Sequence, residues 1–182
     1  HNAGGSALVH DRFSPEEVLV SSNQFRSTAY RDAMRGFEAK PGLLRRVRRG
    51  ERIGPWTVLH PSAGDRFPQA DDNAIVLHGT IEGVKVLLLS DLGKPGQNAL
   101  LERYPDLKAD IVVSGLPTQG EPLADALLEA LRPALIILTD SEYPASQRAT
   151  EKLRTRLEAG ETKVAYTHRA GAVSLSFRGG RW

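Results

Sequence analysis

Apolar residues change their spacing along the chain after residue 90. Before that point, short apolar runs alternate with polar residues, and a tight turn at Glu82-Gly83 marks a hairpin. The strands expected in this part are residues 18–20, stretches within 43–61, and the hairpin strands 74–80 and 84–90. After it, stretches with helical and strand spacing alternate. We expect helices at about residues 97–104, 123–131 and 146–159, and strands at 111–114, 135–139, 164–167 and 172–177.

Two further helices are expected near the N-terminus. A short helical pattern runs through Leu8 and Phe13, and Ser27 is a suitable N-cap for a helix that ends at about Phe37. Hairpins followed by alternating helices and strands are typical of an α/β protein whose sheet is covered by helices. Since no repeat or low-complexity linker interrupts the pattern, we expect residues 1–182 to form one domain.

The composition is that of a globular protein with balanced charge. Hydrophobic residues make up 40% of the chain, and 24 basic against 22 acidic residues leave a net charge of +2. A dedicated nucleic-acid coat would be more basic. The absence of cysteine excludes a disulfide, a thiolate zinc site and a cysteine nucleophile. The longest apolar runs, such as residues 134–138, are too short to cross a bilayer.

Asp91 is the strongest candidate for chemistry. It follows the apolar strand expected at residues 84–89, and a carboxylate at the C-terminal end of a buried strand is held rigidly enough to bind a metal. The alternative, a cap of the turn behind the strand, is the more frequent role of such an aspartate. The sequence contains no phosphate-binding Gly-x-x-x-x-Gly-Lys loop and no Gly-x-Ser-x-Gly elbow.

The other acidic and histidine residues are less specific. Asp71, Asp72 and Asn73 offer oxygen ligands for a hard cation, but Asx residues before a strand more often hydrogen-bond to the backbone, and we favour that interpretation. The five histidines are scattered without the spacing of a metal site, and isolated histidines are mostly exposed or structural. They are His1, His10, His60, His78 and His168.

A run of arginines is the candidate surface for DNA. Arg45, Arg46, Arg48 and Arg49, with Arg52 nearby, are dense enough to contact phosphates. Side chains on a strand alternate between its two faces, which would place Arg46 and Arg48 opposite Arg45 and Arg49. A solvated strand is therefore the favoured interpretation, and DNA contact is the alternative.

The order of three short segments carries a resemblance to a known family. Leu59-His60-Pro61, the strand entry Asp72-Asn73 and the apolar strand ending in Ser90-Asp91-Leu92 follow one another, and further matches lie at residues 107–113, 131–138 and 171–173. This order resembles the C-terminal metallo-β-lactamase-like domain of the ComEC family of DNA-internalisation competence proteins. The resemblance implies an αββα sandwich, of which the chain covers the C-terminal two-thirds or more. It also implies a soluble domain of a bacterial inner-membrane protein, on a side of the membrane that stays open, with DNA and the transmembrane channel part of the same protein as partners.

The metal motifs of that family are only partly present. Asp91 stands where the metal-bridging aspartate is expected, and His1 is similar to the end of the family's His-x-His-x-Asp-His motif. Ser114-Gly115-Leu116-Pro117 occupies the place of its His-His-Gly-Ser, and Glu142-Tyr143-Pro144 the place of a later His-Pro. A centre of two zinc or manganese ions needs several imidazoles and carboxylates. The departures therefore predict a degenerate site without a metal or a small-molecule cofactor.

Three functions are compatible with this pattern. The first, which we favour, is a non-catalytic domain of a ComEC-type protein that takes part in DNA uptake. The second is an active metal-dependent hydrolase, most plausibly a nuclease that degrades the strand that is not imported. The third is an interaction domain that shares only the fold, because a fold alone does not determine a function.

Overall fold

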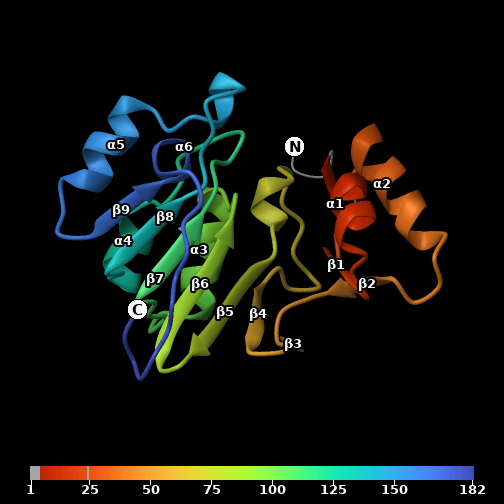
Figure 1. Ribbon diagram of the computed structural model, residues 1–182, viewed down its shortest axis with the longest axis horizontal. Coiled ribbons are helices and arrows are strands. Elements are labelled where there is room, and N and C mark those ends of the chain that lie inside the picture. Colours follow the sequence, from red (N-terminus) through yellow and green to blue (C-terminus); the bar gives the residue numbers. More distant parts are fainter. Residues whose placement is uncertain (1–4, 24) are drawn as a thin grey trace.

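The computed structural model describes residues 5–23 and 25–182, which form a mixed α/β structure (Figure 1). Over these residues the main sheet has seven strands, in the order β3-β4-β5-β6-β7-β8-β9. Its strands are β3 (Arg52–Ile53), β4 (Trp56–His60), β5 (Val76–Ile81), β6 (Val84–Ser90), β7 (Ile111–Ser114), β8 (Leu135–Leu138) and β9 (Lys163–Tyr166). Strands β3 to β6 are antiparallel, and β6 to β9 are parallel. The sheet is therefore mixed, as the change of spacing after residue 90 predicts.

Helices cover one face of this sheet. Three helices follow its parallel strands, and their apolar side chains pack on the buried residues Leu87, Val112 and Ile136. They are α3 (Lys94–Arg103), α4 (Asp125–Leu131) and α5 (Glu151–Glu158). A short helix α6 (Thr167–Ala170) and the 3-10 turns η2 (Asp71–Asn73) and η3 (Ala145–Gln147) lie in the connections.

The N-terminal residues form a smaller unit with its own core. Strands β1 (Val18–Ser21) and β2 (Leu44–Val47) pair in parallel, and α1 (Ser6–Phe13) and α2 (Thr28–Glu38) accompany them. Met34 and Phe37 of α2 pack on Leu43 and on Val18 and Val20 of β1.

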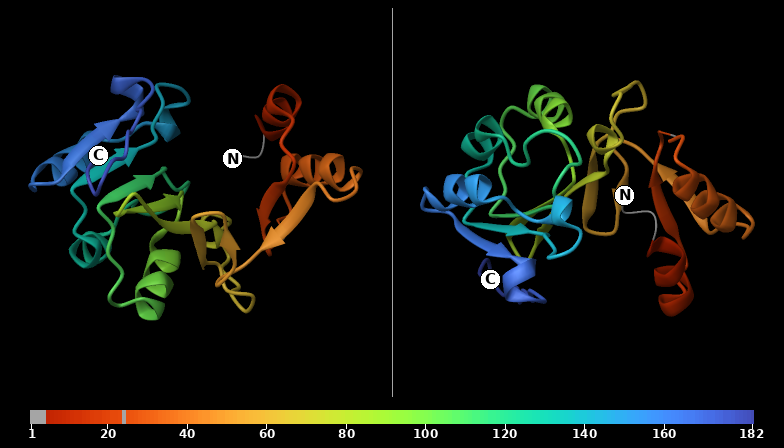
Figure 2. Two further views of the ribbon diagram at one scale, coloured as in Figure 1. Left: turned by 60° about the horizontal axis from the view of Figure 1, so that its bottom comes forward. Right: turned by 90° about the horizontal axis from the view of Figure 1, so that it is seen from above.

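The residue between them, Leu19, lies on the other face of β1. Its side chain lines a cavity together with Leu77 and Leu88 of the main sheet. The two sheets thus lie between two sets of helices, and the views in Figure 2 place α1 and α2 on the opposite side of the molecule from α4 and α5.

Two of the predictions for helices and strands are wrong. The helix expected at residues 146–159 is divided into η3 and α5, because Arg148 is extended and the Thr150 hydroxyl accepts a hydrogen bond from the Leu153 N–H, which makes residue 150 the N-cap of α5. The segment expected as a closing strand at residues 172–177 crosses the main sheet without joining it (Figure 1). Its alternation is real, since Val173, Leu175 and Phe177 pack on the sheet face opposite the helices.

The other elements agree with the expectations to within a few residues. Helix α3 begins three residues early, because Pro95 lies in its first turn, where the missing N–H has no cost. Ser27 caps α2 through a hydrogen bond from the Tyr30 N–H. Among the described residues, no helix is long and apolar enough to cross a membrane.

Candidate functional site

The candidate site lies at the C-terminal edge of the parallel strands. Because β6, β7 and β8 run in the same direction, their last residues meet at one edge of the sheet, where α/β proteins commonly bind ligands. Asp91 follows β6, Ser114 ends β7 and Thr139 follows β8. Together with Ser90 and Gly115, these residues line one part of a cavity of about 460 Å³.

The rest of the cavity wall is apolar. It is formed by the two facing sheets and by the residue just before β5, and its side chains are those of Leu19, Val47, Ile53, Ile75, Leu77, Leu88 and Val113. Among the described residues that line the cavity, the polar groups are the Asp91 carboxylate and the hydroxyls of Ser90, Ser114 and Thr139. The site therefore combines an apolar chamber with one polar, acidic end.

Ser90 has a backbone conformation that favours glycine. Its φ is +56°, and the pairing register shifts between Leu88 and Ser90 where β6 ends. The Ser90 carbonyl accepts a hydrogen bond of 2.9 Å from the Gly115 N–H. This turn holds Asp91 at the end of β6 and fixes it beside the end of β7.

The polar end is tightly packed. Gly115 is buried, and the Asp91 carboxylate lies over its Cα, where any larger residue would place a β-carbon. The Thr139 hydroxyl donates to the Ser114 carbonyl at 3.2 Å, and its N–H donates to the same oxygen at 2.8 Å. In the sequence, Ser114 and Gly115 stand at the position of a metal motif and were given no role. Thr139 was missed, although it follows a parallel strand and could have been found by that position.

The described residues do not fit a two-metal centre. Nowhere between residues 5 and 182, residue 24 aside, do three or more His, Cys, Asp or Glu side chains gather in a way that could hold a metal ion. The polar end of the cavity offers one carboxylate and hydroxyls, whereas such a centre needs several imidazoles. The proposed ligand His1 lies outside the described residues.

The other histidines lie elsewhere. His60 is fully buried, and its ring nitrogen Nε2 lies 2.8 Å from the carbonyl oxygen of Asp72 in η2. Burial lowers the pKa of His60, so it is neutral near pH 7, donates from Nε2 and accepts at Nδ1 from Arg103, 3.4 Å away. Asp65, 3.6 Å from Nδ1, cannot then be its hydrogen-bond acceptor. His60 is a structural residue.

His78 and His168 also make structural contacts. His78 Nε2 lies 3.2 Å from the Lys108 carbonyl, and burial lowers the pKa of this histidine as well. The backbone N–H of His168 donates to the buried Asp140 carboxylate at 2.9 Å. His10, on α1, packs against the Phe37 ring with a centroid separation of 5.7 Å.

The acidic cluster before β5 fixes the loops of the sheet edge. The Asp71 carboxylate accepts from the Thr118 N–H at 2.6 Å, and the Asp72 carboxylate accepts from the Gly96 N–H at 3.2 Å. The Asn73 amide donates to the carbonyls of Phe67 and Gln69. The favoured interpretation of backbone hydrogen bonding is confirmed, although two of these contacts are distant in sequence: Thr118 lies in the loop after β7, and Gly96 lies in α3.

The arginine run is partly neutralised by carboxylates. Arg45 forms ion pairs with Glu17 and Glu51, and the hydrogen bond with Glu17 raises its pKa. Arg48 lies 3.7 Å from Glu51. Arg46 points to the other face of β2, where it pairs with Glu38 at 3.0 Å.

The alternation expected along this run ends with the strand. Strand β2 stops at Val47, so Arg48 and Arg49 lie in the turn that follows, and the expected alternation holds only for Arg45 and Arg46. The Arg49 N–H donates to the Pro61 carbonyl, which ties this turn to the end of β4.

Comparison with known proteins gives a distant similarity. No family profile matches the chain. The chain is similar to ComE operon protein 3 of Bacillus subtilis (strain 168), with 23% identity over 122 residues. The matched stretch covers 66% of this chain and 16% of the length of that relative. The similarity gives weak support for a link to competence.

Proposed function

We propose that this chain is a degenerate metallo-β-lactamase-like domain of a ComEC-type competence protein, and that it serves DNA uptake in natural transformation without catalysing hydrolysis. The observation that carries the proposal is the polar end of the cavity. At that end Asp91 is the one carboxylate among the described lining residues, with hydroxyls and the Gly115 backbone around it. From the resemblance we infer that Asp91 keeps the place of a metal-bridging aspartate.

The fold and the distant relative support the family part of the proposal. The layers of helices and sheets are compatible with an αββα sandwich, and the relative bears the name of a competence operon protein. The relative's length leaves room for further parts, and we propose that the parent protein also contains a transmembrane channel. The domain itself would then be a soluble part of a bacterial inner-membrane protein, with DNA and that channel as partners.

The chemistry of the site supports the lack of catalysis. Activation of a water molecule by two ions depends on ligands that hold both of them. Among the described residues, the cavity offers no imidazole for this purpose. We accordingly propose that the domain uses no metal and no small-molecule cofactor.

A second candidate function rests on Asp91. Its position at the end of a buried parallel strand is the one from which an active metal-dependent nuclease would present a bridging carboxylate. On this alternative the domain binds two zinc or manganese ions and degrades the DNA strand that is not transported.

Metal content separates the two candidates. The full-length gene product is purified without chelators, and its zinc and manganese are measured together with cleavage of single-stranded DNA. We expect no stoichiometric metal and no cleavage. Two ions per chain that are lost in Asp91→Ala, but kept in the exposed control Asp106→Ala, would establish the hydrolase instead.

The competence role has its own test. Deletion of the codons for this domain in the source organism is expected to lower the frequency of natural transformation, whereas Asp91→Ala leaves it unchanged. If the deletion transforms as well as the wild type, the proposed role in DNA uptake is wrong.

A further inference from the structure

A second hollow lies outside the cavity described above, between α2 and β2. Its volume is about 770 Å³, and four arginines line it: Arg26, Arg31, Arg35 and Arg46. Phe25, Tyr30 and Met34 form the apolar part of its wall, and Glu38 is the carboxylate on it. We call this hollow the α2 groove.

The fold brings these arginines together from three segments. Arg31 and Arg35 are four residues apart on α2 and therefore share one face of the helix. Arg46 pairs with Val20 in the β1–β2 register, and Val20 packs toward α2, so both side chains lie on the helix side of the small sheet. Arg26 lies in the segment that leads into α2.

The groove keeps a positive charge after its ion pairs are counted. Arg46 pairs with Glu38 at 3.0 Å, and Arg35 lies 3.5 Å from Asp32 in a solvent-exposed pair that screens little of its charge. Within the described part of the chain, Arg26 and Arg31 have no carboxylate partner. Two exposed guanidinium groups therefore have no ion-pair partner among residues 5–23 and 25–182.

Two aromatic rings lie among these charges. Phe25 and Tyr30 meet edge to face, with ring centroids 5.3 Å apart. Both are half-buried, and the Tyr30 hydroxyl lies 3.5 Å from the Asn23 carbonyl, so the rings are held in the wall of the groove. An aromatic ring fixed beside arginines is a platform on which an unpaired base can stack.

We propose that the α2 groove binds single-stranded nucleic acid, with phosphates on Arg26, Arg31 and Arg35 and a base against Phe25. Guanidinium groups match phosphate geometry, and bases stack on a ring only when they are unpaired. The rings lie in the wall and do not protrude, whereas a surface that binds a membrane inserts its aromatic residues into the lipid. The inference deepens the proposed function and rests on it for the choice of DNA as the ligand.

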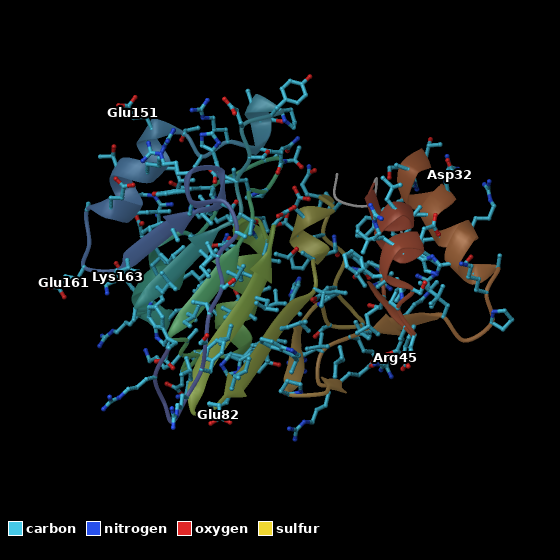
Figure 3. All side chains as sticks on the ribbon, viewed as in Figure 1. Asp32, Arg45, Glu82, Glu151, Glu161 and Lys163 are labelled. Atoms are coloured by element: carbon cyan, nitrogen blue, oxygen red, sulfur yellow. The ribbon has the colours of Figure 1, made fainter. Side chains whose placement is uncertain are left out.

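The α2 groove is distinct from the arginine run at residues 45–49. Arg46 is shared, but Arg45 and Arg48 contact Glu51 and take no part in lining the groove. Figure 3 shows Asp32 on α2 and Arg45 at different places on the N-terminal unit, while Lys163 lies at the far side of the molecule. The two surfaces and a distant control can therefore be tested separately.

Fluorescence anisotropy of a labelled oligothymidylate, titrated with the 182-residue chain at several salt concentrations, tests the proposal. The groove variant Arg31→Gln/Arg35→Gln is compared with Lys152→Gln/Lys163→Gln, which removes the same charge from the far side. Each phosphate contact contributes about 0.7 to the salt dependence of single-strand binding, so the groove variant should lose about 1.4 of the slope and the control none.

The stacking contact is tested in the same assay. Phe25→Leu keeps an apolar side chain but removes the ring, and we expect at least a roughly fivefold weaker affinity, with recovery in Phe25→Trp. Duplex DNA and anionic lipid vesicles serve as competitors, and neither should displace the oligothymidylate as well as unlabelled single strand does.

Several results would overturn the proposal. These are no binding by the wild-type chain at low salt, an equal loss in the groove and control variants, or displacement by vesicles as effective as by single-stranded DNA. A loss confined to Arg48→Gln/Arg49→Gln would move the DNA contact to the arginine run. That outcome removes the α2 groove but leaves the role in DNA uptake, which the transformation assay tests independently.

Discussion

Gly115 lies directly under the carboxylate of Asp91. A β-carbon at residue 115 would be 1.8 Å from Oδ1 and 3.0 Å from Cγ of Asp91, closer than any non-bonded contact allows. Residue 115, just after β7, can therefore carry no side chain while Asp91 keeps its place. The geometry links the two residues as one unit at the polar end of the cavity.

Substitution of Gly115 should accordingly be costly, and the cost should depend on Asp91. We expect Gly115→Ala to lower the free energy of unfolding by about 1–3 kcal/mol, the usual range for an overpacked site. In the background of Asp91→Ala the same substitution should cost much less. Urea unfolding of the four chains measures this coupling, and additive effects would show that the carboxylate does not occupy the space over residue 115.

Ser90 should tolerate glycine better than any branched residue. Its φ of +56° costs a non-glycine residue about 1–2 kcal/mol. Glycine relieves this strain in the folded state, but it also raises the conformational entropy of the unfolded chain, which offsets part of the stabilisation. We expect Ser90→Gly to be neutral or stabilising by up to about 1 kcal/mol and Ser90→Val to be clearly destabilising. Ser114→Gly, in a regular strand, is the matched control and should destabilise by about 0.5–1 kcal/mol.

The buried His60 should make the protein sensitive to mild acid. Burial lowers its pKa in the folded chain below the ordinary value of 6.5, so below that pH the unfolded chain binds more protons. Its contribution to stability is complete above pH 6.5 and is lost as the pH falls toward the folded pKa, by at most about 1.4 kcal/mol per pH unit.

The lowered pKa of His78 acts in the same direction, with a smaller effect because this residue is less buried. We expect the free energy of unfolding to fall between pH 7 and pH 5, and His60→Gln to make this fall shallower. Chemical unfolding of the wild type and of His60→Gln at a series of pH values measures this pH dependence. A steeper fall in His60→Gln would contradict the neutral state assigned to the imidazole.

Arg103 should be needed for stability because it pairs with the buried carboxylate of Asp65. Its guanidinium forms two hydrogen bonds with Asp65, whose side chain is 8% exposed. Burial alone would raise the pKa of Asp65, but the hydrogen bonds from Arg103 and from the Ser62 N–H outweigh it and lower the pKa.

We expect Arg103→Met to destabilise the chain by about 2 kcal/mol at pH 7, less than the 3–5 kcal/mol of a fully buried pair because the guanidinium is partly exposed. Asp65→Asn/Arg103→Met should recover most of the loss, since it leaves no unpaired charge. Thermal or urea unfolding compares the stabilities of the two variants, and a double variant as unstable as Arg103→Met would refute the pairing argument.

Much of the fold was predictable because its signals are local. The hairpin turn at Glu82-Gly83 forms where the sequence predicts it, and the Ser27 cap depends on a residue three positions away. That residues 172–177 do not pair with the main sheet was not predictable. Alternation reports which side chains face the protein, and Val173 and Phe177 are partly buried because their segment lies on the sheet face, without pairing with a strand.

The candidate site was predictable only in part. Asp91 was recognised by its position after an apolar strand. Thr139 reaches the site only because β8 pairs with β7, and no local sequence pattern predicts that pairing. The α2 groove has the same origin. Arg31 and Arg35 show helical spacing in the sequence, whereas their meeting with Arg46 depends on the pairing of β1 with β2.

The order of the strands in the main sheet has a consequence for how the protein is made. From β3 to β9, every strand lies beside the one that precedes it in the chain. Each segment that leaves the ribosome therefore finds its neighbour already synthesised, and no strand has to wait for a later one to insert beside it. Such a sheet can lengthen in step with translation, with only its newest edge exposed at any moment.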